Sequence, residues 1–308
     1  MQRVDYLILN GHVLTMNEQD ACFEDGGVAI LGDRILAVGS SDELRKAFQA
    51  NEVIDASGHV IMPGLVDTYA HAGHGLIRGL FHPEQGWPAQ LYWRLTTPDW
   101  WYAEALLSAC ERLRFGVTTG QSIIGATPAR MDSPAFAEQN ALAYQQVGTR
   151  VVIGVGPPDP IFSHLPTPWR GRFWEDGVWQ ERPFTYEDTI RHSVQIIKDW
   201  HQAAEGRIRV ALAPPYLLGR HVKHGRLNQA LPSEKDVPVM LEHALEMRDL
   251  ADRHGVIVHT HMFEGSVTFA QQHFGQEQVS KLLGPDVVVA HANGLKPSEA
   301  ELLGAMHC

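Results

Sequence analysis

The spacing of apolar positions along the chain changes near residue 60. In residues 1–60, short stretches of alternating apolar residues are separated by turn residues, as in small sheets. Asn10-Gly11 follows the first stretch and is a dipeptide typical of hairpins. Ser40, with Glu43 three positions later, predicts the capped start of a short helix. The predicted strands are Val4–Leu9, His12–Met16, Gly26–Leu31, Arg34–Val38, Val53–Ala56 and His59–Met62. We therefore predict an N-terminal β unit over residues 1–60, the portion of a β-sandwich that forms half of a composite domain.

From Pro63 onward, compact apolar runs alternate with amphipathic segments. Continuous apolar runs are typical of strands buried on both faces, as in a parallel sheet. The runs are Gly64–Asp67, Val117–Ile123, Arg150–Val155, Ile208–Ala213, Val256–His261 and Asp286–Ala290. Helix starts lie between them, such as Thr97-Pro98 and Thr185 with Asp188 three residues on. Six strand–helix units in succession predict an α/β fold of the (β/α)8 TIM-barrel type over residues 61–308.

The end of the sequence bears on how complete this barrel is. Pro297 predicts the start of a last helix that ends near Gly304, and Ala305–Cys308 resembles the opening of a seventh strand. We therefore expect only about six strand–helix units in this chain, with two further barrel strands beyond Cys308.

Composition excludes several classes of function. The 308 residues carry 25 basic and 36 acidic side chains, a net charge of −11, so nucleic acid and anionic membrane are not expected partners. The sequence has no apolar run of about 18 residues and no signal-peptide pattern at its start, so we expect no membrane span. The three cysteines are widely spaced, and a reducing cytoplasm is the expected location. The 17 histidines favour a metal or acid–base site.

The first candidate site residue is His71, which follows the predicted strand Gly64–Asp67. A His-x-His pair on a strand would place both imidazoles on one face, where they could chelate one Zn²⁺ or Fe²⁺. Tyr69 occupies the partner position here. A neutral phenol is a poor ligand, because its ordinary pKa is about 10. Taken alone, a histidine such as His71 is more often structural than a metal ligand. Its place after Pro-Gly-Leu-Val-Asp (residues 63–67) reverses this preference and favours a ligand.

The second group of candidates surrounds a later strand. His259 and His261 alternate on one face, and Glu264 lies just past the strand end. His291 ends the next apolar run, one helix further along the chain. The alternative interpretation is a buried strand that ends in a surface glutamate.

Taken together, these motifs resemble the amidohydrolase superfamily, in its branch of aminohydrolases and deaminases that includes triazine hydrolases and guanine-, cytosine- and S-adenosylhomocysteine-deaminase-like proteins. The resemblance extends from Val4 to Cys308. It implies one divalent metal, Zn²⁺ in preference to Fe²⁺, held by His71 and His261, with Tyr69 where a second His is usual. Glu264 would shuttle a proton, and His291 would orient the attacking water or the developing oxyanion. His259, deeper in the strand, would support the site.

The same resemblance suggests where a substrate binds. The segment that contains His74 and Arg78 is similar to the substrate loop of triazine- and nucleobase-type deaminases. Trp87 lies in the same loop and could stack on a planar ring. The implied substrate is a small heterocycle.

Three functions stay open at this point. The first is a metal-dependent hydrolase of carbon–nitrogen bonds other than peptide bonds, which deaminates or dechlorinates a planar N-heterocycle with metal-activated water. The second is one half of a split enzyme, in which a complementing chain supplies strands seven and eight and a ligand aspartate. The third is a catalytically impaired remnant or binding module that keeps the pocket. A homo-oligomer or a complementing chain is the expected protein partner, because an open barrel leaves unpaired edges.

Overall fold

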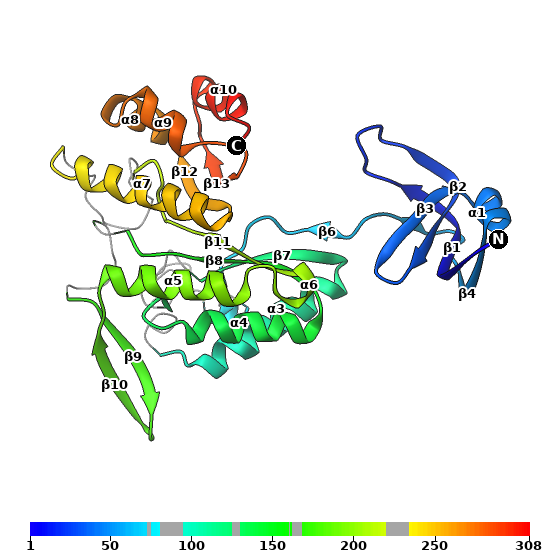
Figure 1. Ribbon diagram of the computed structural model, residues 1–308, viewed down its shortest axis with the longest axis horizontal. Helices are drawn as coiled ribbons and strands as arrows, with labels where there is room; N and C mark the ends of the chain where they lie inside the picture. Colours follow the sequence, from blue (N-terminus) through cyan, green and yellow to red (C-terminus); the bar gives the residue numbers. More distant parts are fainter. Residues whose placement is uncertain (73–74, 81–94, 125–129, 160, 162–167, 220–233) are drawn as a thin grey trace. The chain divides into compact units, whose positions relative to one another are not determined.

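The computed structural model describes residues 1–72, 75–80, 95–124, 130–159, 161, 168–219 and 234–308 (Figure 1). The chain divides into two compact units, Met1–Leu65 and Val66–Cys308.

The first unit is a single five-stranded sheet with one helix. Its strands are β1 (Gln2–Leu14), β2 (Cys22–Leu31), β3 (Arg34–Ser40), β4 (Phe48–Asp55) and β5 (Val60–Ile61). Their order is β3-β2-β1-β4, and β5 pairs with β1. Helix α1 (Ser41–Ala47) begins with the predicted capping box, since Ser40 accepts from the Glu43 amide. Leu44 of α1 packs with Val4, Leu7, Leu9 and Ala29 in a small core.

The predicted hairpin at Asn10-Gly11 is wrong. β1 continues through this dipeptide, and its pairing with β2 shifts register on both sides of Gly11. Asn10 has a φ of 65°, so its left-handed backbone produces a bulge in the strand. The strand continues because it has partners on both sides, β2 on one side and β4 and β5 on the other.

The second unit contains all six predicted barrel strands. They are β6 (Leu65–Val66), β7 (Val117–Ile123), β8 (Arg150–Val155), β11 (Ile208–Leu212), β12 (Val258–Phe263) and β13 (Val287–Asn293). The sheet order is β13-β12-β11-β8-β7-β6, and the pairs from β7 to β13 are parallel. This is a partial TIM barrel, as predicted, in which β6 and β13 are the end strands within the described residues.

Helices flank this sheet in the order expected for strand–helix units (Figure 1). They are α3 (Pro98–Arg114), α4 (Ala135–Val147), α5 (Tyr186–Trp200), α6 (Ala203–Gly206), α7 (Val237–His254), α8 (Ser266–His273), α9 (Gln276–Leu282) and α10 (Pro297–Ala305), with the short 3-10 helix η1 (Arg78–Leu80). Thr97 caps α3 and Thr185 forms a capping box with Asp188 at α5, as predicted. None of the helices in the described parts of the chain combines the length and apolar character needed to cross a membrane.

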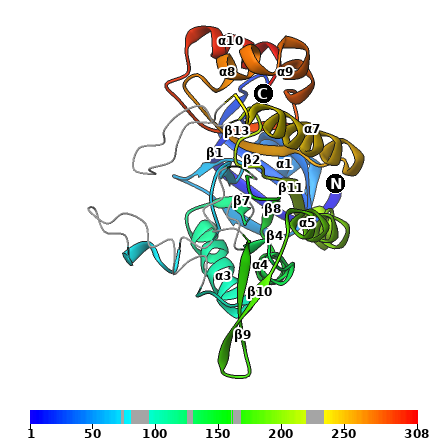
Figure 2. The same ribbon diagram turned by 90° about the vertical axis from the view of Figure 1, so that its left-hand side faces the viewer.

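Two local features differ from the sequence-based expectation. The pair β9 (Arg170–Glu175) and β10 (Val178–Pro183) forms an additional antiparallel hairpin, which Figure 2 shows projecting from the second unit. Asp176-Gly177 forms its turn, with both residues at positive φ. Residues 306 and 307 form a turn after α10 and not the start of a strand, because the Met306 and His307 amides bond back to Leu302 and Gly304.

Candidate metal centre

The candidate residues come together at the carboxyl ends of barrel strands. Tyr69 and His71 follow β6, and His71 forms an isolated parallel bridge with Ile123 of β7. His261 lies on β12 and His291 on β13. The carboxyl ends of barrel strands meet at one face, where the active sites of this fold lie. The structure thus joins three histidines from distant parts of the sequence.

The hydroxyl of Tyr69 is the point at which these histidines meet. Its oxygen lies 2.9 Å from Nε2 of His71, 3.1 Å from Nε2 of His291 and 3.2 Å from Nε2 of His261. A phenol can donate one hydrogen bond and accept two. Three imidazoles therefore use its full capacity, and at least two of them must donate an Nε2–H to it.

The Tyr69 phenol is held in its neutral form. Burial raises its pKa to about 12, and the neighbouring Tyr216 adds to this effect. At neutral pH the hydroxyl therefore acts as a hydrogen-bonding group and carries no charge. This state suits the three-imidazole contact without a metal.

His71 and His261 have the spacing of two metal ligands. Their Nε2 atoms are 3.4 Å apart, and their rings are stacked with an interplanar angle of 24°. Two nitrogens that each bind a tetrahedral zinc at about 2.1 Å are separated by about 3.4 Å. Among the described residues, no group of three His, Cys, Asp or Glu side chains is arranged to hold a metal ion. The pair fits a metal, and the nearest further oxygen donor is the Tyr69 hydroxyl.

A bulge in β13 positions His291. His291 and Ala292 have φ values of 68° and 51°, and the register of β13 with β12 shifts at this point. Non-glycine residues adopt these angles only when the surrounding structure imposes them, and such strain is common at functional sites. The His291 ring stacks on Phe263 at 5.2 Å between centroids. The bulge thereby directs His291 toward Tyr69.

His259 lies on β12, two residues before His261, and is almost fully buried, with 1% of its surface exposed. Its ring is parallel to that of Tyr69, at 5.6 Å between centroids and an interplanar angle of 15°. Burial, together with His291, lowers the pKa of His259 to about 4, so the ring is neutral. Neither ring nitrogen has a hydrogen-bond partner in the described part of the chain. Its contact with Tyr69 is through the ring face.

Glu264 lies in the turn after β12 and is exposed. Its amide donates to the carbonyl of Asn293, at 3.1 Å, so the turn is attached to the end of β13. Gly294 packs against the side chain of Glu264. No side chain or amide among the described residues hydrogen-bonds to its carboxylate.

The predicted substrate loop is described only in part. His74 and Trp87 lie outside the described residues. Arg78, in η1, makes two hydrogen bonds to Glu111 of α3, at 2.7 and 3.1 Å. Its guanidinium is thus engaged in an exposed ion pair.

Two parts of the chain match known protein families. Residues 60–305 match the amidohydrolase family, and residues 26–48 match an imidazolonepropionase-like composite domain of bacteria. The chain belongs to the amidohydrolase family. The matched range covers every candidate residue from Tyr69 to His291.

Several amidohydrolase relatives resemble nearly the whole chain. A 5-methylthioadenosine/S-adenosylhomocysteine deaminase of Syntrophobacter fumaroxidans is 29% identical over 98% of this chain and 60% of its own length. A 5'-deoxyadenosine deaminase of Methanococcoides burtonii is 26% identical over 97% of this chain and 59% of its own length. The chain thus spans about 60% of the length of these curated relatives.

Solved structures show the same fold. An adenosine deaminase of Xanthomonas campestris with bound zinc has a TM-score of 0.67 and 20% identity, covering 99% of this chain and 62% of that one. An atrazine chlorohydrolase variant of Arthrobacter aurescens, complexed with zinc and atraton, has a TM-score of 0.64 and 18% identity, covering 98% and 64%.

Two residues near the histidine cluster, Tyr216 and Asp67, were not among the predicted site residues. Tyr216 follows β11, and its ring centroid lies 6.2 Å from that of His261. Asp67 binds Arg112 of α3 at 2.8 Å, and Arg112 also donates to the Gln121 carbonyl. This ion pair connects the end of β6 to α3 and β7. Asp67 was visible in the Gly64–Asp67 run, whereas no local pattern marks Tyr216.

Proposed function

We propose that this chain carries the metal-dependent hydrolase site of an aminohydrolase that acts on a planar N-heterocycle. The observation that carries the proposal is the convergence of His71, His261 and His291 on one point, within the range that matches the amidohydrolase family. Glu264, whose carboxylate has no hydrogen-bond partner among the described residues, lies in the turn directly after the strand that bears His261. This combination suits attack of water on a carbon–nitrogen bond.

In the proposed site, His71 and His261 hold one divalent ion, zinc in preference to iron. Imidazole nitrogens suit both ions, and their spacing fits tetrahedral zinc. When bound, such an ion lowers the pKa of a water and polarises the bond to be broken. Glu264 takes a proton from the attacking water and gives it to the leaving amine or to a ring nitrogen. His291 donates a hydrogen bond to the oxygen that gains charge.

The proposed substrate class is a purine-like ring with an exocyclic amino group. Support comes from the names of the relatives, which act on 5-methylthioadenosine, S-adenosylhomocysteine or 5'-deoxyadenosine. The structural relatives named for adenosine and atrazine also act on planar N-heterocycles. Deamination of an adenine ring is therefore the reaction to test first.

The first test combines metal content with ammonia release. The 308-residue chain supplemented with zinc should retain about one equivalent per chain and release ammonia from 5'-methylthioadenosine or 5'-deoxyadenosine. The His261→Ala variant should lose both properties, because it removes one of two imidazoles 3.4 Å apart. Elemental analysis and an ammonia assay provide the readouts. A wild-type chain that binds no zinc after supplementation would defeat the proposal.

A second candidate function follows from Tyr69. Its neutral hydroxyl lies within hydrogen-bond distance of three imidazoles, in the position where a second histidine ligand would be expected. A binding module that retains the pocket and lacks hydrolysis would show this arrangement. Tight binding of an adenine nucleoside to metal-free protein, with no ammonia release after zinc addition, would favour this function.

We also propose that the chain associates with a second copy or with a complementing chain. Large apolar side chains are exposed on the first unit, including Ile35 (66%), Val53 (60%) and Val60 (57%). Exposed apolar side chains mark association surfaces where they form a contiguous patch. Light scattering should therefore give a mass above the 34.3 kDa of one chain. A monodisperse monomer at micromolar concentration would contradict this proposal.

A further inference from the structure

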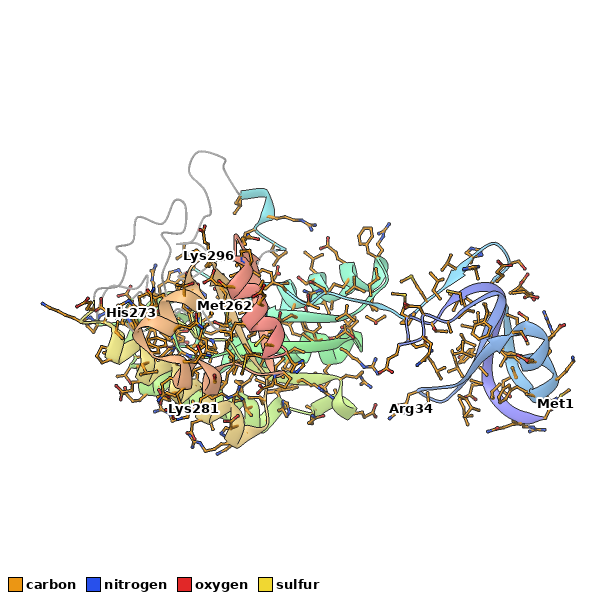
Figure 3. The ribbon with its side chains drawn as sticks, turned by 90° about the horizontal axis from the view of Figure 1, so that it is seen from above. Met1, Arg34, Met262, His273, Lys281 and Lys296 are labelled. Atoms are coloured by element: carbon orange, nitrogen blue, oxygen red, sulfur yellow. The ribbon has the colours of Figure 1, made fainter. Side chains whose placement is uncertain are left out.

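Glu299 is a buried acid far from the candidate metal centre in the sequence. It lies in the first turn of α10, and only 1% of its surface is exposed. A buried carboxylate is unfavourable unless hydrogen bonds compensate for the lost solvation. Figure 3 labels Lys296, at the start of α10, and Met262 on β12, the strand that precedes the turn of Glu264 and Gly265.

The carboxylate of Glu299 accepts four hydrogen bonds. One oxygen accepts from the amides of Gly265, at 3.1 Å, and Lys296, at 3.0 Å. The other accepts from the amide and the hydroxyl of Thr268, both at 3.0 Å. Burial raises its pKa, but these donors outweigh burial and the net pKa is lowered. Glu299 is therefore ionised at neutral pH.

Through these bonds, Glu299 supplies the cap that α8 lacks. The N-cap residue of α8 is Gly265, which has no side chain to accept from the first turn. The first amides of a helix need an acceptor, and a negative charge there is favoured by the helix dipole. The same oxygen that accepts from Gly265 also caps α10 at Lys296. One carboxylate thus joins two helix starts.

Glu264 immediately precedes the residue that Glu299 holds. Its own amide is bonded to Asn293, and the Phe263 amide donates to Ser266. The turn is therefore attached to β13 on one side and to α10 on the other. A proton-transfer group must be positioned within a fraction of an ångström to be effective.

We propose that Glu299 is the positioning residue for Glu264, an inference that rests on the proposed function. It does not contact the reacting atoms. It fixes the turn that directs the Glu264 carboxylate, and it connects this turn to α10.

Glu299→Gln tests the inference with little change in shape. Glutamine keeps one accepting oxygen, but its NH2 group only donates, so at least one backbone N–H that now donates to the carboxylate would face another donor. In zinc-loaded full chain with 5'-methylthioadenosine, kcat should fall roughly 10- to 100-fold, with KM changed less than about threefold. Glu301→Gln, an exposed change on the same helix, is the matched control and should leave both unchanged.

A double-mutant cycle separates positioning from general destabilisation. If Glu299 acts through Glu264, then Glu299→Gln should lower kcat little further in a Glu264→Gln background. Fully additive losses, or an unchanged kcat in the single variant, would overturn the inference. Thr268→Val removes one of the four bonds and should give a smaller loss in the same direction if Glu299→Gln does not fold.

Amide hydrogen-exchange rates test the inference without depending on activity. In Glu299→Gln, the amides of Gly265 and Thr268 should exchange faster by on the order of tenfold, and in Glu301→Gln they should not. Unchanged exchange would show that Glu299 does not order the turn. Absence of ammonia release by the wild type would count against the proposed function alone.

Discussion

Replacing Glu264 by Gln should lower kcat for adenine-nucleoside deamination by about 100- to 10,000-fold while zinc content stays unchanged. Glutamine has nearly the same shape but cannot take a proton from water or return it to a leaving group. Zinc should remain because Glu264 is not among the residues that meet at Tyr69. Steady-state ammonia release and elemental analysis on the same preparation measure both quantities.

The matched control for this variant is Glu277→Gln. Glu277 is an exposed glutamate of α9 that pairs with Lys281 at 2.8 Å, so this change removes one charge at a surface ion pair. Its kcat should stay within about twofold of the wild type, because a surface ion pair contributes little. A Glu264→Gln enzyme with wild-type kcat would show that proton transfer uses another group.

Replacing Tyr69 by His should tighten zinc binding by about 10- to 100-fold or more. The imidazole would offer a lone pair beside Nε2 of His71, where the Tyr69 hydroxyl now lies, without first losing a proton. The phenol must lose its proton to become a good ligand, and burial and Tyr216 raise its pKa to about 12. Competition with a chromophoric chelator at neutral pH measures the change in Kd.

Two further substitutions make this result interpretable. Tyr6→His places a new imidazole on a half-exposed residue of the first unit and should leave the zinc Kd unchanged. Tyr69→Phe keeps the ring and removes the hydroxyl. If the hydroxyl serves only as a hydrogen-bond partner, zinc affinity should not fall in Tyr69→Phe. A large fall would identify the oxygen as a metal ligand, and an unchanged Kd in Tyr69→His would contradict the prediction.

The arrangement at Tyr69 also explains why the two proposed functions can share one fold. The neutral phenol lies within hydrogen-bond distance of all three imidazoles. A metal at His71 and His261 needs lone pairs on nitrogens that now donate to or accept from the phenol. Under the proposed function, zinc loading would therefore compete with these contacts.

The barrel strands could be predicted because their apolar runs result from burial on both faces. Val117–Ile123 and Arg150–Val155 were predicted to the residue, and the other runs agree within a few positions. Local dipeptides were less informative. Asn10-Gly11 and Asp176-Gly177 carry the same turn signal, but only the second forms a hairpin, because β1 has partners on both sides.

By itself, the sequence determined where the barrel strands end and which candidate side chains follow them, since strand positions follow from short-range periodicity. It identified His71, His261, Glu264 and His291 one by one. Tertiary structure alone decided that three of these imidazoles meet at the Tyr69 hydroxyl, since strand pairing joins positions about 190 and 220 residues apart. It also decided that Glu299 caps the turn of Glu264. The physical reason is that a buried polar group takes whichever partner the packing of distant elements provides, and no local pattern encodes that partner.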